Sequence, residues 1–176
     1  MHATLPAPSL HLAILMRTGW AFVFFLVTAG SLIGCSTPPP LKVQTENSTS
    51  RLTPEQAKDV TVYAIGLVGT PYRWGGNTPE SGFDCSGLIA HVYQKSAFLR
   101  TPRTVAELKE WGAPVTTNAI RSGDLIVFSK GNESTHAGIY VGDGRFVHAP
   151  STGGRVRLDR FTSSYWSSYK IAFNRP

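Results

Sequence analysis

The order of its hydrophobic patterns constrains the fold of this chain more than any other feature of the sequence. Apolar residues recur at helical spacing in the first segments, 54–68, 85–95 and 105–110. Beyond residue 114 they form short β-rich runs bounded by turn residues, at 124–128, 137–141, 145–148, 155–158 and 169–173. Helices followed by antiparallel strands are typical of an α+β domain. We therefore expect N-terminal helices packed on a central antiparallel sheet of about five to six strands.

Residues 1–34 have the pattern of an export signal. Arg17 precedes a short apolar run at 20–27, and small residues then lead to a Leu-Ile-Gly-Cys sequence that ends at Cys35. A basic start, a short apolar core and small residues before a cleavage point are typical of a secretory signal peptide. The ending resembles the lipobox of bacterial lipoproteins, which implies cleavage before Cys35 and lipidation of that cysteine. An uncleaved membrane anchor is the alternative, and Met16 is a second candidate start.

Residues 35–52 are expected to tether a folded domain, residues 53–176, to the membrane. They are polar and rich in proline, so they bury too little apolar surface to offset the entropy of ordering. Ser36 follows the lipidated position, and in lipoproteins of Gram-negative bacteria this residue type usually accompanies sorting to the outer membrane. The resemblance therefore implies a lipid-anchored outer-membrane protein that faces the periplasm.

Charge and cysteine count argue against several classes of protein. The 17 Lys and Arg residues against 11 Asp and Glu residues give a net charge of +6, but the basic residues are scattered along the domain. This pattern disfavours a nucleic-acid partner and suits an anionic surface such as a bacterial cell envelope. The two cysteines, Cys35 and Cys85, lie in separate motifs, and no Cys/His spacing typical of zinc is present. We expect neither a disulfide nor a structural metal.

Residues 82–88, Gly-Phe-Asp-Cys-Ser-Gly-Leu, contain the strongest candidate for a reactive group. A glycine-hinged loop leads Cys85 directly into an apolar run at 88–93, which predicts a helix that begins at or near the cysteine. Unpaired N–H groups and the helix dipole favour an anion there, so we expect a lowered thiol pKa and a larger thiolate fraction. The alternative is an ordinary buried cysteine.

Two downstream histidines, His136 and His148, are candidates for a base because they flank a predicted hairpin that turns at 142–144. A two-residue loop would place His148 opposite Ile139, on the sheet face that His136 does not share. A three-residue loop with a G1 bulge at its last glycine would place His148 opposite Gly138 and diagonal to His136. We predict the bulged turn, with both histidines on one face.

Several motifs follow one another in a recognisable order along the domain: Pro71-Tyr72-Arg73-Trp74-Gly75-Gly76, segment 82–88, Pro102-Arg103-Thr104, Gly123-Asp124-Leu125, segment 136–142 and His148-Ala149-Pro150. Together they resemble the NlpC family of papain-like cell-wall cysteine peptidases over residues 54–176. The resemblance implies a circularly rearranged papain-like fold and no cofactor. It also implies hydrolysis of peptidoglycan peptides at bonds that involve D-amino acids or diaminopimelate.

The same resemblance assigns catalytic roles to three residues. It implies that Cys85 is the nucleophile, His136 the base and His148 the polar residue that orients the base. A cysteine peptidase needs these three functions for attack on the scissile carbonyl and for protonation of the leaving amine. His91, which lies on the helix after Cys85, is interpreted as a structural residue.

Three further residues are implied to lie near the substrate. Tyr72 corresponds to a cleft tyrosine close to the nucleophile, and Asp84 and Ser86 correspond to positions close to the bound peptide. Residues 72–77 form either a wall of that cleft or an aromatic loop that fills the core. Two other functions remain open on the same scaffold: a non-catalytic envelope lipoprotein that binds wall peptides, and an amidase or acyltransferase that acts on lipid or another amide.

Overall fold

The computed structural model describes residues 50–151 and 154–176 of the protein. The α-helices in this part of the chain are α1 (Pro54–Gly66), α2 (Cys85–Ala97) and α3 (Val105–Lys109). The strands are β1 (Asn77–Thr78), β2 (Gly82–Phe83), β3 (Ala113–Val115), β4 (Leu125–Lys130), β5 (Glu133–Gly142), β6 (Arg145–His148), β7 (Arg157–Arg160) and β8 (Lys170–Arg175). Two short 3-10 helices are η1 (Thr117–Ala119) and η2 (Trp166–Ser168).

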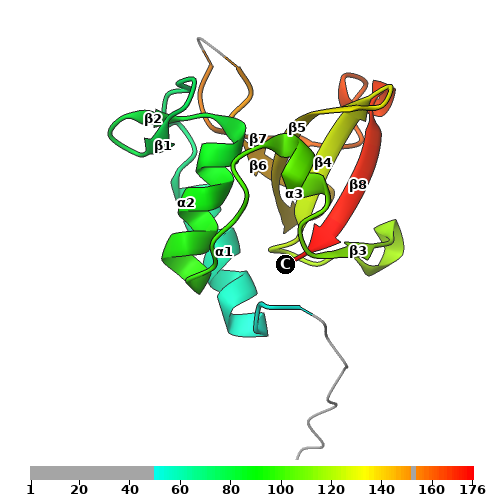
Figure 1. Cartoon of the computed structure of the whole chain (residues 1–176), viewed down its shortest axis with the longest axis horizontal. Coiled ribbons are helices and arrows are strands. Elements are labelled where there is room, and N and C mark those ends of the chain that lie inside the picture. Colours follow the sequence, from blue (N-terminus) through cyan, green and yellow to red (C-terminus); the bar gives the residue numbers. More distant parts are fainter. Residues whose placement is uncertain (1–49, 152–153) are drawn as a thin grey trace, which may run out of the picture. The chain divides into compact units, whose positions relative to one another are not determined.

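Six of the described strands form one antiparallel sheet in the order β3-β8-β4-β5-β6-β7. β1 and β2 pair separately just before α2. Helices α1 and α2 pack together and against β5 on one side of the sheet, and α3 contacts β4 and β5 (Figure 1). The predicted α+β class and the expected number of strands are confirmed.

The sheet separates two groups of buried side chains, because successive residues of a strand point to opposite faces. On the face covered by α1 and α2, Val127 and Ile139 of the sheet belong to a cluster with Leu88 and Val92 of α2, called here the helix-side cluster. The other face holds a smaller group, called here the aromatic cluster: Ile126, Phe128, Phe146, Trp166 and Phe173. Residues that alternate along β4, β5 and β6 are therefore committed to one cluster or the other.

Helix α1 begins where the sequence predicts and ends slightly earlier. The Thr53 hydroxyl accepts a hydrogen bond from the N–H of Gln56, and the Gln56 side chain accepts one from the N–H of Thr53, which forms a capping box. At the other end, the N–H groups of Leu67 and Val68 bond to carbonyls three residues back. This tighter final turn ends the α-helix at Gly66, two residues before the predicted end.

Two departures from the predicted strands have local causes. The sequence did not predict β3, because proline is rare in strands and Pro114 lies at its centre. β3 accommodates this proline because it is an edge strand of the sheet. β7 begins two residues later than predicted because Val156 pairs elsewhere. Its N–H donates to the carbonyl of Thr70 and its carbonyl accepts from the N–H of Gly69, each at 2.8 Å.

The folded domain begins earlier than predicted. The N–H of Arg51 donates to the Pro176 carbonyl at 2.6 Å, and the Ser50 hydroxyl donates to the same oxygen at 2.8 Å. The side chain of Leu52 is buried in the helix-side cluster. Residues 50–52 therefore belong to the domain and not to the tether, because their backbone and one apolar side chain find partners there.

The predicted signal peptide, residues 1–34, and the predicted lipidation site Cys35 lie outside the described residues. Within residues 50–151 and 154–176, every helix is too short or too polar to cross a membrane.

Phe98, the C-cap of α2, has a left-handed backbone conformation, with a φ of 57°. This conformation costs an L-residue about 1 kcal/mol, and packing offsets little of it because 82% of the Phe98 surface is exposed. We expect Phe98→Gly to raise the free energy of unfolding by roughly 0.5–1 kcal/mol in urea denaturation. Phe98→Ala is the matched control, because it removes the ring and keeps the backbone cost; an equal gain in both variants would contradict a backbone origin.

Candidate active site

Cys85 is the first residue of α2, as the glycine-hinged loop predicts. Asp84 caps the helix: its Oδ1 accepts hydrogen bonds from the N–H of Gly87 at 2.6 Å and from the Ser86 hydroxyl at 3.0 Å. The Cys85 side chain is half-buried at this terminus. N–H groups in the first turn of a helix have no acceptor within the helix, so they can stabilise negative charge beside the thiol.

Asp84 and Ser86, the two residues implied to lie close to the peptide, make bonds within the protein. The Oδ2 atom of Asp84 accepts a hydrogen bond from the N–H of Gly75 at 2.9 Å and lies 3.8 Å from Nη2 of Arg103. Ser86 is buried and donates its hydroxyl to Asp84. The pair therefore joins loop 73–76 to the start of α2, and a substrate contact by either residue stays a prediction.

Close backbone approach explains two glycines of the motifs around Cys85. A Cβ atom on Gly87 would collide with the carbonyl oxygen of Gly76, and a Cβ atom on Gly76 would collide with the carbonyl oxygen of Gly82. Only glycine fits where a backbone carbonyl lies so near. The glycine pattern thus brings the loop before α2 against the helix terminus that carries Cys85.

The thiol of Cys85 has a raised pKa, which corrects the prediction from its helix position. Burial raises the pKa of Cys85, and the Asp84 carboxylate raises it further. The backbone N–H groups of Ser86, Cys85 and Ala137 act in the opposite direction and lower it. The helix terminus does stabilise the thiolate as expected, but the loss of solvent is the larger effect.

Tyr72 lies near the same thiol. Burial raises the pKa of Tyr72, and negative charge on Cys85 and Asp84 raises it further. The N–H of Tyr72 donates to the carbonyl of Gly154 at 2.8 Å, which fixes the backbone of this loop. Trp74, two residues further on, is 86% exposed, so its ring does not fill the core. The exposed ring argues against the interpretation of residues 72–77 as an aromatic loop that fills the core.

The turn between β5 and β6 differs from the predicted one. Gly142 pairs with Arg145, and the two residues between them, Asp143 and Gly144, have φ values of 50° and 70°. Positive φ at both central residues is the requirement of a two-residue type I′ turn. The predicted three-residue loop with a G1 bulge is therefore wrong.

The predicted register of the two histidines is nevertheless confirmed, because the bulge lies elsewhere. The pairing shifts by one residue at Val141, and beyond it Ile139 pairs with Val147. Continuing this register sets His148 opposite the residue before Ile139 and diagonal to His136. The extra residue is thus in strand β5 and not in the loop, and both histidines lie on the face of the aromatic cluster.

His136 and His148 are in direct contact. Nε2 of His136 lies 2.8 Å from Nδ1 of His148, and the two rings are nearly perpendicular, at 82°. Trp166 stacks on the His136 ring at a centroid distance of 5.3 Å and meets the His148 ring edge-on at 5.4 Å. Exposure is 8% for His136 and 0% for His148. Packing against one tryptophan therefore holds both imidazoles in a fixed relative orientation.

The N–H of Ala137 connects the thiol to this histidine pair. It is one of the groups that stabilise the Cys85 thiolate, so the sulfur lies at the amide of the residue that follows His136. α2 also packs on β5, the strand that carries His136 and Ala137. The thiol of Cys85 is thereby close to the strand that carries His136, and His136 contacts His148.

Both imidazoles are neutral at physiological pH. Burial lowers the pKa of His136 from 6.5 to about 3, and positive charge on His148 and Arg157 acts in the same direction. Burial lowers the pKa of His148 to about 4, although the Asp159 carboxylate opposes this shift. Neutral His136 can accept a proton, as a general base must.

Asp159 and Trp166 complete the surroundings of the histidines, and the sequence motifs did not identify them. Nε2 of His148 lies 3.1 Å from Oδ2 of Asp159, on the neighbouring strand β7. The indole Nε1 of Trp166 donates to the same oxygen at 3.3 Å. Register supplies the only signal for Asp159, since β6–β7 pairing sets Arg157 opposite His148 and Asp159 diagonal to it on the same face.

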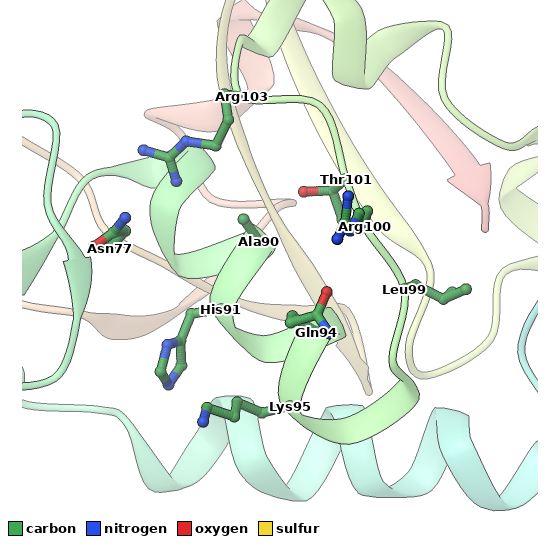
Figure 2. A pocket seen from close by; sticks show the side chains of 9 residues that line it. All are labelled: Asn77, Ala90, His91, Gln94, Lys95, Leu99, Arg100, Thr101 and Arg103. Carbon is green, nitrogen blue, oxygen red and sulfur yellow. The ribbon is translucent and has the colours of Figure 1, made fainter.

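A separate cavity of about 340 Å³ opens on α2, between its outer face and segment 99–103 (Figure 2). Its lining consists of Asn77, Ala90, His91, Gln94, Lys95, Leu99, Arg100, Thr101 and Arg103. Neither Cys85 nor either histidine of the pair is among these residues. His91 bonds to the Tyr63 hydroxyl at 2.9 Å, which fits the structural role expected for it. The cavity is therefore distinct from the candidate active site.

Comparison with known proteins yields close relatives in sequence. Murein DD-endopeptidase MepH of Escherichia coli K12 is 37% identical over 112 residues, which cover 61% of this chain and 41% of that protein. Murein DD-endopeptidase MepS/Murein LD-carboxypeptidase of the same organism is 38% identical over 98 residues, which cover 56% of this chain and 51% of that protein. The chain thus spans about half the length of these relatives.

Solved structures and a family model agree with these relatives. The NlpC/p60 domain of the peptidoglycan hydrolase SagA has a TM-score of 0.58 and 28% identity, covering 66% of this chain and 96% of that one. A lipoprotein-like member of the NLP/P60 family from Staphylococcus aureus Mu50 has a TM-score of 0.62 and 28% identity, covering 74% of this chain and 44% of that one. These neighbours confirm the papain-like fold class. Because the NlpC/P60 family model matches residues 69–175, more than half of its 176 residues, the chain belongs to the NlpC/P60 family.

Proposed function

We propose that this chain is a cell-wall cysteine endopeptidase that hydrolyses peptide bonds in peptidoglycan stem peptides or crosslinks, with Cys85, His136 and His148 as its catalytic residues. One observation carries the proposal: the thiol at the head of α2 lies at the amide next to His136, and His136 contacts His148 at 2.8 Å. Membership of the NlpC/P60 family supports it.

The first half of the reaction forms an acyl-enzyme. As the sulfur of Cys85 bonds to the scissile carbonyl carbon, its proton passes to the ring nitrogen of His136 that does not contact His148. The tetrahedral oxyanion accepts a hydrogen bond from the backbone N–H of Cys85, which has no acceptor within the helix, and we assign the Tyr72 hydroxyl a supporting role. The carbon–nitrogen bond then breaks, and His136 returns the proton to the leaving amine.

Water completes the reaction by the reverse proton path. His136 takes a proton from the attacking water, the new oxygen–carbon bond forms, and the sulfur–carbon bond breaks. The sulfur of Cys85 leaves as the thiolate and regains its proton from His136. Since burial disfavours charge on both groups, the resting pair is neutral thiol and neutral imidazole, and proton transfer accompanies the attack.

Names of the relatives support the substrate class. MepH is called a murein DD-endopeptidase, and a relative from Bacillus subtilis 168, 37% identical over 110 residues, is called a gamma-DL-glutamyl hydrolase. Both names specify bonds that involve D-amino acids. We infer that this chain cleaves such bonds in wall peptides, and product analysis by mass spectrometry would identify which bond.

Incubating the purified full chain, solubilised in detergent, with isolated muropeptides tests the proposed function. Cleavage by the wild type and none by Cys85→Ala is the expected result. Muropeptides left intact by both proteins would overturn it. Binding of the same muropeptides without cleavage would then favour a non-catalytic lipoprotein.

Trp74 is expected to contribute to substrate binding and not to chemistry. Its ring is 86% exposed on the loop whose Gly75 bonds to Asp84, so it is free to pack on a peptide in the cleft. We expect Trp74→Ala to raise KM roughly 3- to 10-fold with kcat within about twofold of wild type, because one aromatic contact contributes on the order of 1 kcal/mol. Phe98→Ala is the control, since Phe98 is equally exposed at the far end of α2. A changed kcat with unchanged KM would contradict this role.

We further propose that Cys35 is lipidated and that the domain faces the periplasm from the outer membrane. The lipobox-like sequence before Cys35 and the serine that follows it support this localisation. Metabolic labelling with an alkyne palmitate analogue should mark the wild type and leave Cys35→Ala unlabelled. Recovery of the labelled protein with inner-membrane vesicles would contradict the outer-membrane part of the proposal.

A further inference from the structure

One carboxylate oxygen of Asp159 lies within hydrogen-bond distance of several polar groups next to the histidine pair. Oδ2 of Asp159 lies 3.1 Å from Nε2 of His148 and 3.3 Å from Nε1 of Trp166. Arg157 reaches the same oxygen with Nε at 3.1 Å and Nη2 at 2.9 Å. Arg157 and Trp166 can only donate, so they hold an acceptor oxygen at this point, directly behind His148.

This arrangement determines which nitrogen of each imidazole carries a proton. A carboxylate only accepts, so Nε2 of His148 must donate to Asp159. A neutral imidazole has a single N–H, which leaves Nδ1 of His148 as an acceptor and makes Nε2 of His136 the donor of the 2.8 Å bond. The remaining nitrogen of His136, Nδ1, is then unprotonated.

We propose that Asp159 is a positioning residue, which fixes the tautomers of His148 and His136 so that His136 presents an unprotonated Nδ1 to Cys85. The catalytic consequence of these tautomers rests on the proposed function, whereas the tautomers themselves follow from the geometry alone. Without the carboxylate, His148 could carry its proton on Nδ1 and donate to Nε2 of His136. His136 would then hold its proton on Nδ1 and could not accept one from the thiol.

The charges around the pair act in opposite directions on this proton transfer. When His136 takes the thiol proton it becomes a cation, and it retains its bond to Nδ1 of His148. Asp159 is the acidic group that acts on both histidines, and Arg157 is the cationic group that acts against their protonation. The Asp159 carboxylate keeps its own charge throughout, so no proton moves beyond His136 in the catalytic cycle.

Nitrogen-15 NMR of the histidine side chains in the full chain provides the first test, and it requires no variant. Long-range proton–nitrogen correlations distinguish protonated from unprotonated ring nitrogens. We expect protonated Nε2 and unprotonated Nδ1 on both His136 and His148 near pH 7. A protonated Nδ1 on His148 would overturn the proposal. This measurement does not depend on turnover, so wild-type protein with these tautomers but no hydrolysis would refute the proposed function alone.

Two variants of Asp159 provide the second test. Asp159→Asn keeps an acceptor oxygen for Arg157 and Trp166, so it should retain the wild-type tautomers and lose less than about 10-fold in kcat. Asp159→Leu removes the acceptor, and we expect mixed tautomers on His148 and a loss of about 10- to 100-fold in kcat with little change in KM. Asp59→Leu, on the exposed surface of α1, is the matched control.

Wild-type tautomers and wild-type kcat in a folded Asp159→Leu variant would overturn the proposal. If that variant fails to fold, a shifted tautomer or a loss above 10-fold in Asp159→Asn would also count against the acceptor role.

Discussion

Cys85→Ala is expected to lower kcat for muropeptide cleavage by on the order of 10⁴-fold or more, because it removes the atom that forms the covalent intermediate. The free energy of unfolding should change by less than about 1 kcal/mol, since the thiol is only half-buried and its replacement is small. Single-turnover assays with mass-spectrometric detection of products measure the loss. Urea denaturation of the same preparations checks that the fold is retained.

Histidine variants serve as graded controls for this result. His136→Gln should lose about as much activity as Cys85→Ala, while His148→Gln should keep a measurable rate because an orienting residue contributes less than a nucleophile or a base. His136→Gln should also slow alkylation of Cys85 by iodoacetamide at neutral pH, since burial raises the thiol pKa and the base assists deprotonation. Turnover in Cys85→Ala that matches the wild type would eliminate the proposed mechanism.

Acid should destabilise the domain through its two buried histidines. In the folded state the pKa of His136 is about 3 and that of His148 about 4, whereas both have values near 6.5 when unfolded. The unfolded chain therefore binds protons that the folded chain excludes, so stability falls as the pH drops below 6.5 and levels off near pH 3. At pH 5 the loss should be ~2 kcal/mol for each histidine, relative to pH 7 and above.

Urea denaturation of the wild type and of His136→Gln/His148→Gln between pH 7 and pH 5 isolates this effect. The double variant should have a shallower dependence of stability on pH by ~4 kcal/mol over that interval, whatever its absolute stability. His91, whose pKa burial also lowers, is present in both proteins, and the lowered pKa of Asp159 matters only at more acidic pH. Parallel pH profiles in the two proteins would show that the histidines are not held neutral by folding.

Local patterns in the sequence were sufficient for the helices and most of the sheet. The capping residue Thr53 and the glycine-hinged approach to Cys85 predicted where α1 and α2 begin, because N-terminal caps depend on neighbours within one turn. The end of the predicted tether and the start of β7 were predicted at the wrong residues, because both depend on contacts that are distant in the sequence. Residues 50–52 and 155–156 find partners at the C-terminus and in segment 69–71, which no local pattern encodes.

In the candidate site, too, some features could be predicted from local motifs and others depend on tertiary contacts. The motifs identified Cys85, His136 and His148, but the sign of the thiol pKa shift depends on burial, which arises from tertiary packing. The histidine register was predicted with the bulge in the loop, whereas the bulge is at Val141 in the strand, since both arrangements add one residue between the paired positions. Asp159 lies on a separate strand, so its part in the site required the observed pairing.

The residues proposed to react lie on different structural elements of the domain. Cys85 begins α2, while His136 and His148 lie on β5 and β6 and pack on Trp166. A slight parting of α2 from β5 would separate the sulfur from the imidazole before the domain unfolds as a whole. Mild denaturant should consequently abolish hydrolysis before circular dichroism detects unfolding. A hydrolase that loses its activity when its packing loosens is poorly able to damage the wall that it is proposed to cut.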